Sequence, residues 1–249
     1  METVKDALQY LVELGVEASK PDLLEICGKT YANRELIRYG ETAKAKAVHA
    51  GTLSAMVEYI GQCSGEFPEE QKMLVHIVSP KEVRLMSSLD KERTRECLFV
   101  SEAEVSEFRF DAWYSQERFM IELQANFQKN EDLEAVMRLA GNIEKKNQQT
   151  YSDDGVTQVA TMSVGVAAKA DAMVPNPVEL IPFRTFQEVA QPPSRFVFRI
   201  GDQAEPQFKI VEAEGGIWKN AAICNIKKYL IDAIGTMPDE IRDRIIVIG

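Results

Sequence analysis

The sequence contains few of the side chains that bind metals or carry catalysis at neutral pH. Histidine occurs twice among 249 residues, as His49 and His76, so a catalytic histidine pair or a histidine-rich metal cage is nearly excluded. The chain has four cysteines, which are Cys27, Cys63, Cys97 and Cys224. No two of them have the C-x-x-C spacing of zinc or redox sites. We interpret them as free thiols that pack as small apolar side chains.

Long apolar runs and an excess of basic residues are also missing. No segment approaches the roughly 18 apolar residues that a membrane-spanning helix needs. The charged start, Met1–Asp6, lacks the apolar core of a signal peptide. The formal net charge is −10, which opposes binding to duplex DNA and to anionic membrane surfaces. We therefore predict a cytoplasmic protein that does not bind membranes and for which binding to duplex DNA is unfavourable.

The glycine and serine motifs of common enzyme classes are absent as well. The chain has no G-x-x-x-x-G-K-[ST] phosphate loop and no G-x-G-x-x-G dinucleotide turn; it also has no G-x-S-x-G nucleophile elbow. Gly215 and Gly216 precede an expected helix, where free backbone amides can bind phosphate. Because Glu212 and Glu214 flank this pair, we interpret it as a sharp turn whose acids complement the helix dipole. We expect no cofactor, no bound metal and no enzymatic activity.

Hydrophobic periodicity predicts an α+β fold. Five segments have helical spacing: Val4–Leu14, Thr52–Cys63, Ser115–Gln128, Asp132–Asn142 and Ile217–Ile234. Eight segments are expected to be strands: Met73–Val78, Glu82–Ser87, Arg93–Phe99, Val156–Val166, Leu180–Phe186, Arg195–Ile200, Phe208–Glu212 and Ile245–Ile248. Short turns favour a mainly antiparallel sheet with the helices grouped on one face. We expect an N-terminal helical arm over residues 1–47 and a single compact domain over residues 48–249.

One block of the sequence combines arginine, phenylalanine and proline. If residues 195–199 form a strand, Arg195 and Arg199 share one face and the two intervening phenylalanines share the other. Guanidinium groups suit phosphate or carboxylate recognition, so the block indicates an anion site. The alternative is ion pairing with some of the 39 acidic residues. The candidate ligand-binding residues are Arg184, Arg195, Arg199, Phe183, Trp218 and Lys219.

Carboxylates offer a different hypothesis. Asp153 and Asp154 precede a glycine and an expected strand, which is typical of a turn. Carboxylate oxygens also bind hard cations. A metal-dependent nuclease that uses these two residues with Glu212 and Glu214 therefore stays open as an alternative.

Several weak patterns gain weight when they are taken together. They are Thr52–Ser54, Val57–Ile60, Phe119–Phe127, Asp153–Gln158, Val174–Pro177, Pro182–Phe186, Gln191–Arg199 and Glu212–Lys219. As a set, they resemble the prophage-encoded family of unknown function typified by the YfdQ protein. The resemblance covers roughly residues 50–235 and implies a phage or prophage origin and a soluble protein in the bacterial cytoplasm. It also implies that the gene lies near phage genes for replication and recombination. The family has no established catalytic residues that could be assigned to this chain.

These observations favour a homo-oligomeric phage protein that binds rather than catalyses. We expect it to sequester a host protein or a small anionic, nucleotide-like ligand in a counter-defence role. One alternative is an accessory factor of phage DNA replication or recombination that binds single-stranded DNA or a recombinase. The other is the metal-dependent nuclease described above.

Overall fold

The computed structural model describes residues 2–20, 23–26, 29–32, 44–67, 71–105, 108–143, 151–153, 157–164, 168–201 and 206–249. The chain divides into two compact units, Met1–Lys44 and Ala45–Gly249. The boundary predicted from the sequence, between residues 47 and 48, lies a short distance further along the chain. The second unit, which we call the main unit, contains two hydrophobic cores.

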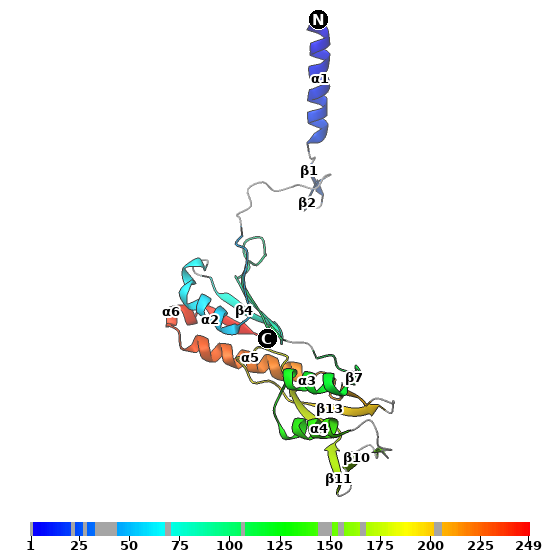
Figure 1. Cartoon of the computed structure of the whole chain (residues 1–249). Coiled ribbons are helices and arrows are strands. Elements are labelled where there is room, and N and C mark those ends of the chain that lie inside the picture. Colours follow the sequence, from blue (N-terminus) through cyan, green and yellow to red (C-terminus); the bar gives the residue numbers. More distant parts are fainter. Residues whose placement is uncertain are drawn as a thin grey trace. The chain divides into compact units, whose positions relative to one another are not determined.

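The first unit consists of a helix and a two-stranded hairpin. Helix α1 spans Glu2–Ser19, and strands β1 (Leu23–Ile26) and β2 (Lys29–Ala32) pair antiparallel (Figure 1). The helix is longer than the predicted segment 4–14 because its apolar periodicity continues for another turn. Pro21 follows, and the residue before a proline disfavours helical backbone.

A five-stranded sheet, which we call the β4 sheet, organises one part of the main unit. Its strands lie in the order β15-β4-β5-β6-β3. In that order they span Ile245–Ile248, Met73–Ser79, Glu82–Met86, Cys97–Glu102 and Val48–Ala50. The predicted antiparallel meander of β4, β5 and β6 is confirmed, and so is the edge strand β15. The two edge strands pair parallel to their neighbours.

Helices α2 (Leu53–Gln62) and α5 (Trp218–Gly235) pack against the β4 sheet (Figure 1). The predicted start of α2 is confirmed, because the Thr52 hydroxyl accepts a hydrogen bond from the Ala55 amide at 3.3 Å. A 3₁₀ helix, η1 (Ser64–Glu66), follows α2, and the short helix α6 (Asp239–Arg242) precedes β15. The sheet and these two helices share one hydrophobic core, which we call the β4 core. It includes Leu53, Met56, Ile60, Met73, Val75, Ile77, Val83, Leu85, Ile226, Leu230 and Ile234.

A second five-stranded sheet, which we call the β13 sheet, is antiparallel throughout. Its order is β7-β14-β13-β12-β8. In that order its strands span Tyr114–Ser115, Gln207–Glu212, Ser194–Gly201, Val178–Pro182 and Phe127–Gln128. Helices α3 (Gln116–Asn126) and α4 (Glu131–Asn142) pack on it (Figure 1). The second hydrophobic core, which we call the β13 core, lies between this sheet and the two helices. It includes Phe119, Leu123, Leu133, Val136, Phe196, Phe198 and Phe208.

The strand predicted at Arg93–Phe99 is wrong in its bounds, since β6 spans Cys97–Glu102. The reason is a longer turn between β5 and β6. The Asp90 carboxylate accepts hydrogen bonds from the Glu92 amide at 2.9 Å and from the Thr94 amide at 2.8 Å. This local bonding replaces strand pairing over the preceding residues.

The helix predicted to reach Gln128 is also too long, because α3 ends at Asn126. The Asn126 side chain donates a hydrogen bond to the Glu122 carbonyl at 2.9 Å. The two residues after it, β8, leave the helix and pair with β12. Tertiary strand pairing therefore overrides the helical spacing of Phe127.

The fold is α+β with predominantly antiparallel sheets, as predicted. The grouping of the helices on one face of a sheet is not confirmed, because α2 and α5 belong to the β4 core, whereas α3 and α4 belong to the β13 core. A further antiparallel sheet, β11-β10-β9, spans Ala168–Pro175, Thr157–Val164 and Tyr151–Asp153. Among the helices that the structure describes, none has the length and apolar character needed to cross a bilayer.

Candidate functional site

The bridging loop, residues 183–193, joins strand β12 to strand β13 and connects the two cores. It leaves the β13 sheet after β12 and returns to it at β13. Between these ends, Phe186 and Val189 are buried in the β4 core. Pro192 and Pro193 restrict the backbone just before β13. The block that the sequence singles out is therefore this loop together with the strand after it.

Gln191 gives the bridging loop its internal structure. Its Oε1 accepts hydrogen bonds from the Arg184 amide at 3.0 Å and from the Thr185 amide at 3.3 Å. Its Nε2 donates to the Phe186 carbonyl at 2.9 Å. The side chain is only 7% exposed, so these bonds satisfy an amide that would otherwise be buried without partners. One residue thus holds the loop closed.

Three further hydrogen bonds tie the loop to its surroundings. The Thr185 hydroxyl donates to the Pro80 carbonyl, which lies between β4 and β5. On the other side, the Asn225 side chain of α5 donates to the Ala190 carbonyl at 2.9 Å. The Phe183 amide donates to the Asn126 carbonyl, the last of α3, at 2.8 Å. The loop is therefore bonded to elements that belong to both cores.

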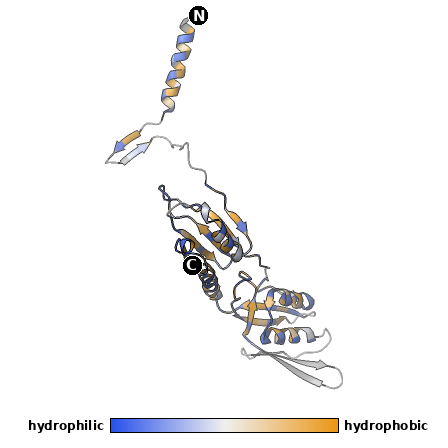
Figure 2. Cartoon of the chain, turned by 90° about the vertical axis from the view of Figure 1, so that its left-hand side faces the viewer, coloured by the Kyte–Doolittle hydropathy of each residue, from blue (hydrophilic) through white to orange (hydrophobic). Residues whose placement is uncertain are grey.

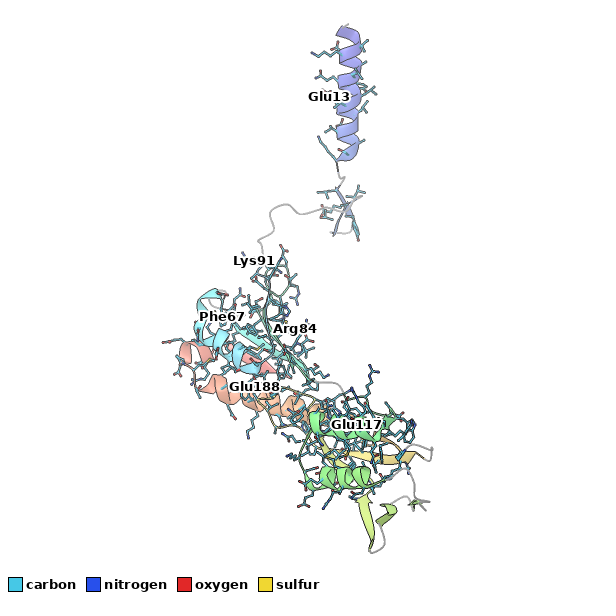
Figure 3. The ribbon with its side chains drawn as sticks, in the orientation of Figure 1. Glu13, Phe67, Arg84, Lys91, Glu117 and Glu188 are labelled. Carbon is cyan, nitrogen blue, oxygen red and sulfur yellow. The ribbon has the colours of Figure 1, made fainter. Side chains whose placement is uncertain are left out.

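Glu188 brings a carboxylate to the N-terminus of helix α2. Its Oε1 accepts hydrogen bonds from the Leu53 amide at 2.8 Å and from the Ser54 amide at 3.2 Å. Figure 3 labels Glu188 in the part of the main unit that contains α2. The negative charge lies at the positive end of the helix dipole. It also satisfies amides that have no partner within the helix.

Arg184 forms a buried cluster with residues from three other segments. Its guanidinium donates to the Glu212 carboxylate at 3.1 Å and to the Ser194 hydroxyl at 2.5 Å. The same group lies 4.0 Å from the centre of the Trp218 ring, a cation–π contact. Arg184 is 7% exposed. The cluster therefore joins the bridging loop to the ends of β13 and β14 and to the first turn of α5.

The charge of Arg184 is set by two opposing effects. Burial lowers the pKa of the guanidinium, and the nearby Glu212 carboxylate raises it. Arginine nevertheless stays charged in proteins, so Glu212 acts as its counter-ion. Among the described residues, Arg184 Nε is a buried side-chain atom that has no hydrogen-bond partner.

The other predicted site residues lie in several places. Arg195 and Arg199 project from the face of β13 opposite to the buried phenylalanines, as predicted. Arg195 lies 3.7 Å from the Glu214 carboxylate, which agrees with the ion-pair alternative. The Lys219 side chain runs past Gly216, where an added Cβ would lie 3.6 Å from it. The structure thus brings Arg184 and Trp218 together but places Arg195 and Arg199 on another face.

Two cavities lie along the bridging loop. The first has a volume of about 590 Å³ and the second about 400 Å³. Both volumes fall within the roughly 300–1,000 Å³ typical of ligand sites. The first is lined by Gly51, Thr52, Ser54, Ala103, Glu104, Thr185, Phe186, Gln187 and Glu188. The second is lined by Glu104, Val105, Ala125, Gln128, Phe183, Gln187, Val189 and Gln191.

The two cavities share Glu104 and Gln187 and therefore adjoin. Their polar lining consists of carboxylates, amides and hydroxyls. None of their lining residues, all of which the structure describes, is Lys, Arg or His. Such a lining favours a ligand with a positive charge or several hydrogen-bond donors.

Sequence reasoning missed most of this site. Of the six predicted residues, Phe183 lines the second cavity. Thr52 starts one of the predicted helices, but nothing in the spacing of Glu104, Gln187 or Glu188 marks them as neighbours. Glu188 and Leu53 are 135 residues apart in the chain, so only the tertiary fold brings them together.

The four carboxylates of the nuclease hypothesis do not form a site among the described residues. Glu212 pairs with Arg184, and Glu214 pairs with Arg195. Asp153 ends strand β9, and Asp154 lies outside the described residues. Within the described part of the chain, no three His, Cys, Asp or Glu residues are placed to hold a metal ion.

Comparison of the chain with known proteins found no relative. No family model matches the chain, and no significant match was found among curated proteins or among solved structures. The resemblance to the prophage family stays a prediction from the sequence. The functional inference therefore rests on the bridging loop, the cavities and their charge.

Proposed function

We propose that this chain is a binding protein rather than an enzyme. In this proposal it is a homo-oligomeric phage or prophage protein that acts in the bacterial cytoplasm, where it sequesters a host factor. The partner presents a positively charged or donor-rich group, such as a lysine or arginine side chain, to the cavities along the bridging loop. The resemblance described above is the support for a phage origin.

The observation that carries the proposal is the pair of adjoining cavities with acceptor-rich walls. Glu104 borders both of them and is exposed. A carboxylate at the mouth of a cavity forms strong, charge-assisted hydrogen bonds with a cation. The net charge of −10 also favours encounter with a basic partner.

The construction of the bridging loop supports binding in a second way. Gln191, Thr185 and Glu188 tie the loop to itself, to the β4–β5 turn and to α2. A loop that is already ordered loses little conformational entropy when a partner binds. The cavity walls are therefore preorganised.

The test is an NMR titration of the full chain with three small probes. The probes are the N-acetyl amides of lysine, arginine and glutamate. We expect the two cationic probes to shift the amide signals of Gly51 and Gln187. Glu104→Gln should weaken their binding about tenfold, which is the loss of roughly one charge-assisted hydrogen bond.

The matched control is Glu102→Gln, which makes the same charge change at an exposed position of β6 outside both cavities. It should leave probe binding unchanged. Equal shifts with the glutamate probe, or equal weakening in both variants, would count against a cation-binding cavity.

A second candidate, an anionic ligand, is favoured by a different surface. Arg199 and Lys209 are paired neighbours on β13 and β14, and Arg195 lies on the same strand face. The Lys209 ammonium lies 5.0 Å from the Trp113 ring, although it also pairs with Asp111 at 2.7 Å. Stacking beside cations suits a nucleotide or single-stranded DNA.

This candidate predicts that Arg195→Ala with Arg199→Ala abolishes binding of a mononucleotide or an oligonucleotide. Salt should weaken oligonucleotide binding steeply and mononucleotide binding less. Unchanged binding in the double variant would remove the candidate.

A further inference from the structure

Helix α1 presents an apolar stripe that the described residues of the first unit leave exposed. The helix has 18 residues and is therefore about 27 Å long. Val4, Leu8, Leu11 and Val12 are 59–65% exposed. Figure 2 shows hydrophobic and hydrophilic residues alternating along this helix. Because most of the stability of a helix in a protein comes from the packing of its amphipathic face, a stable α1 needs a surface that covers the stripe.

The apolar residues of α1 repeat every seven positions. Val4, Leu11 and Ala18 form one series, and Ala7 and Leu14 form a second. The two series alternate at spacings of three and four, which is the pattern of helices that pack along a common seam. The small side chains of Ala7 and Ala18 allow close approach. A partner with the same repeat would match this seam along its length.

The stripe is wider than a two-helix seam requires. Leu8 and Val12 extend it on one side, and Tyr10 extends it on the other. A helix in a two-stranded coiled coil buries a narrow stripe, whereas a broader stripe needs neighbours on both sides. The width therefore indicates that more than one other helix contacts α1.

The charges of α1 indicate what kind of helices contact it. Its acidic residues Asp6, Glu13 and Glu17 gather opposite the seam, and Figure 3 labels Glu13 on this helix. Lys5 is the single basic residue of the helix. An acidic polar face opposes docking on an anionic membrane. It does not oppose copies of the same helix, because the acids point away from the seam.

We infer that α1 joins the α1 helices of other copies of this chain in a bundle of three or more helices. The apolar seam forms the centre of the bundle, and the acidic faces lie outside. This arrangement deepens the proposed homo-oligomer by naming the element that assembles it. It rests on α1 alone and not on ligand binding, so its failure would leave the cavity proposal standing.

The test is analytical ultracentrifugation of the full chain and of two matched variants. Leu8→Glu with Leu11→Glu, the seam variant, places two negative charges in the apolar stripe, one of them in the seam itself. Lys5→Gln with Gln9→Glu makes the same change in net charge on the polar face. We expect the wild-type chain and the polar-face variant to sediment as one oligomer of at least three copies, and the seam variant to sediment as a monomer.

Two results would overturn the inference. A wild-type monomer or dimer would exclude the bundle, and a seam variant that keeps the full oligomer would place the interface elsewhere. A wild-type monomer that cosediments with vesicles of phosphatidylcholine and phosphatidylglycerol would indicate a membrane surface instead. A wild-type monomer whose main unit is destabilised by the seam substitutions would indicate that the stripe packs on its own chain.

Discussion

At the scale of single residues, Arg184 shows how burial changes the role of a charged side chain. Its type suggested anion binding, but its guanidinium is already bonded to Glu212 and Ser194 and lies against Trp218. An added anion would have to compete with a carboxylate at 3.1 Å. The buried arginine therefore contributes to stability, whereas the Arg195 side chain is 62% exposed.

Replacement of Arg184 by methionine should destabilise the protein markedly. The change leaves Glu212 without its counter-ion and removes the contact with Trp218, so we expect the free energy of unfolding to fall by about 3 kcal/mol. Urea denaturation followed by circular dichroism measures this loss. The control is Arg195→Met, whose partner lies at 3.7 Å and whose side chain is 62% exposed. It should cost less than about 1 kcal/mol, and similar losses in the two variants would contradict a special role for Arg184.

At the scale of elements, helix α2 depends on caps from two different origins. Thr52 directly precedes the helix and starts the segment predicted from the sequence, whereas Glu188 comes from the bridging loop. Both oxygens accept hydrogen bonds from amides in the first turn, where the helix provides no partners of its own. The loop therefore stabilises α2 as well as lining the first cavity.

Glu188→Ala should lower the free energy of unfolding by about 1–2 kcal/mol, because two first-turn amides lose their acceptor. Glu188→Gln keeps an uncharged acceptor and should lose less. Glu58→Ala, at an exposed position of the same helix, serves as the control and should change stability little. Thermal unfolding of the three variants gives the comparison. An alanine variant as stable as the wild type would show that the cap has no energetic role.

At the scale of the whole molecule, the main unit has two cores that share one loop. Phe186 contributes to the β4 core although the strands before and after its loop, β12 and β13, belong to the β13 sheet. It is 1% exposed. A mutation there tests whether the β4 sheet can be loosened while the β13 sheet stays intact.

We expect Phe186→Ala to lower the free energy of unfolding by roughly 3–5 kcal/mol, as other deletions of a buried ring do. Hydrogen exchange measured by mass spectrometry should show faster exchange in β4, β5 and β6 than in the wild type. The strands β13 and β14 should change less, because local opening follows the affected core. Phe183→Ala, at a half-buried position of the same loop, should have a smaller effect. Equal acceleration in both sheets would mean that the two cores open together.

Local patterns in the sequence predicted much of the secondary structure. The cap at Thr52, the stripe of α5 and the alternation of arginine and phenylalanine on β13 follow from spacings of two to four residues. Such spacings determine hydrogen bonding within a turn and the face on which a side chain lies. They are set by the backbone geometry of a single element.

The tertiary structure alone decided the site and the division into two cores. The meeting of Glu188 with α2, the enclosure of Arg184 by Glu212 and Trp218, and the parallel pairing of β15 with β4 join segments far apart in the chain. A local spacing carries no information about which distant surface covers it, since that depends on how all the apolar faces pack together. The sequence by itself therefore determined the elements and their amphipathic faces, and packing determined which charges were paired and where cavities remained.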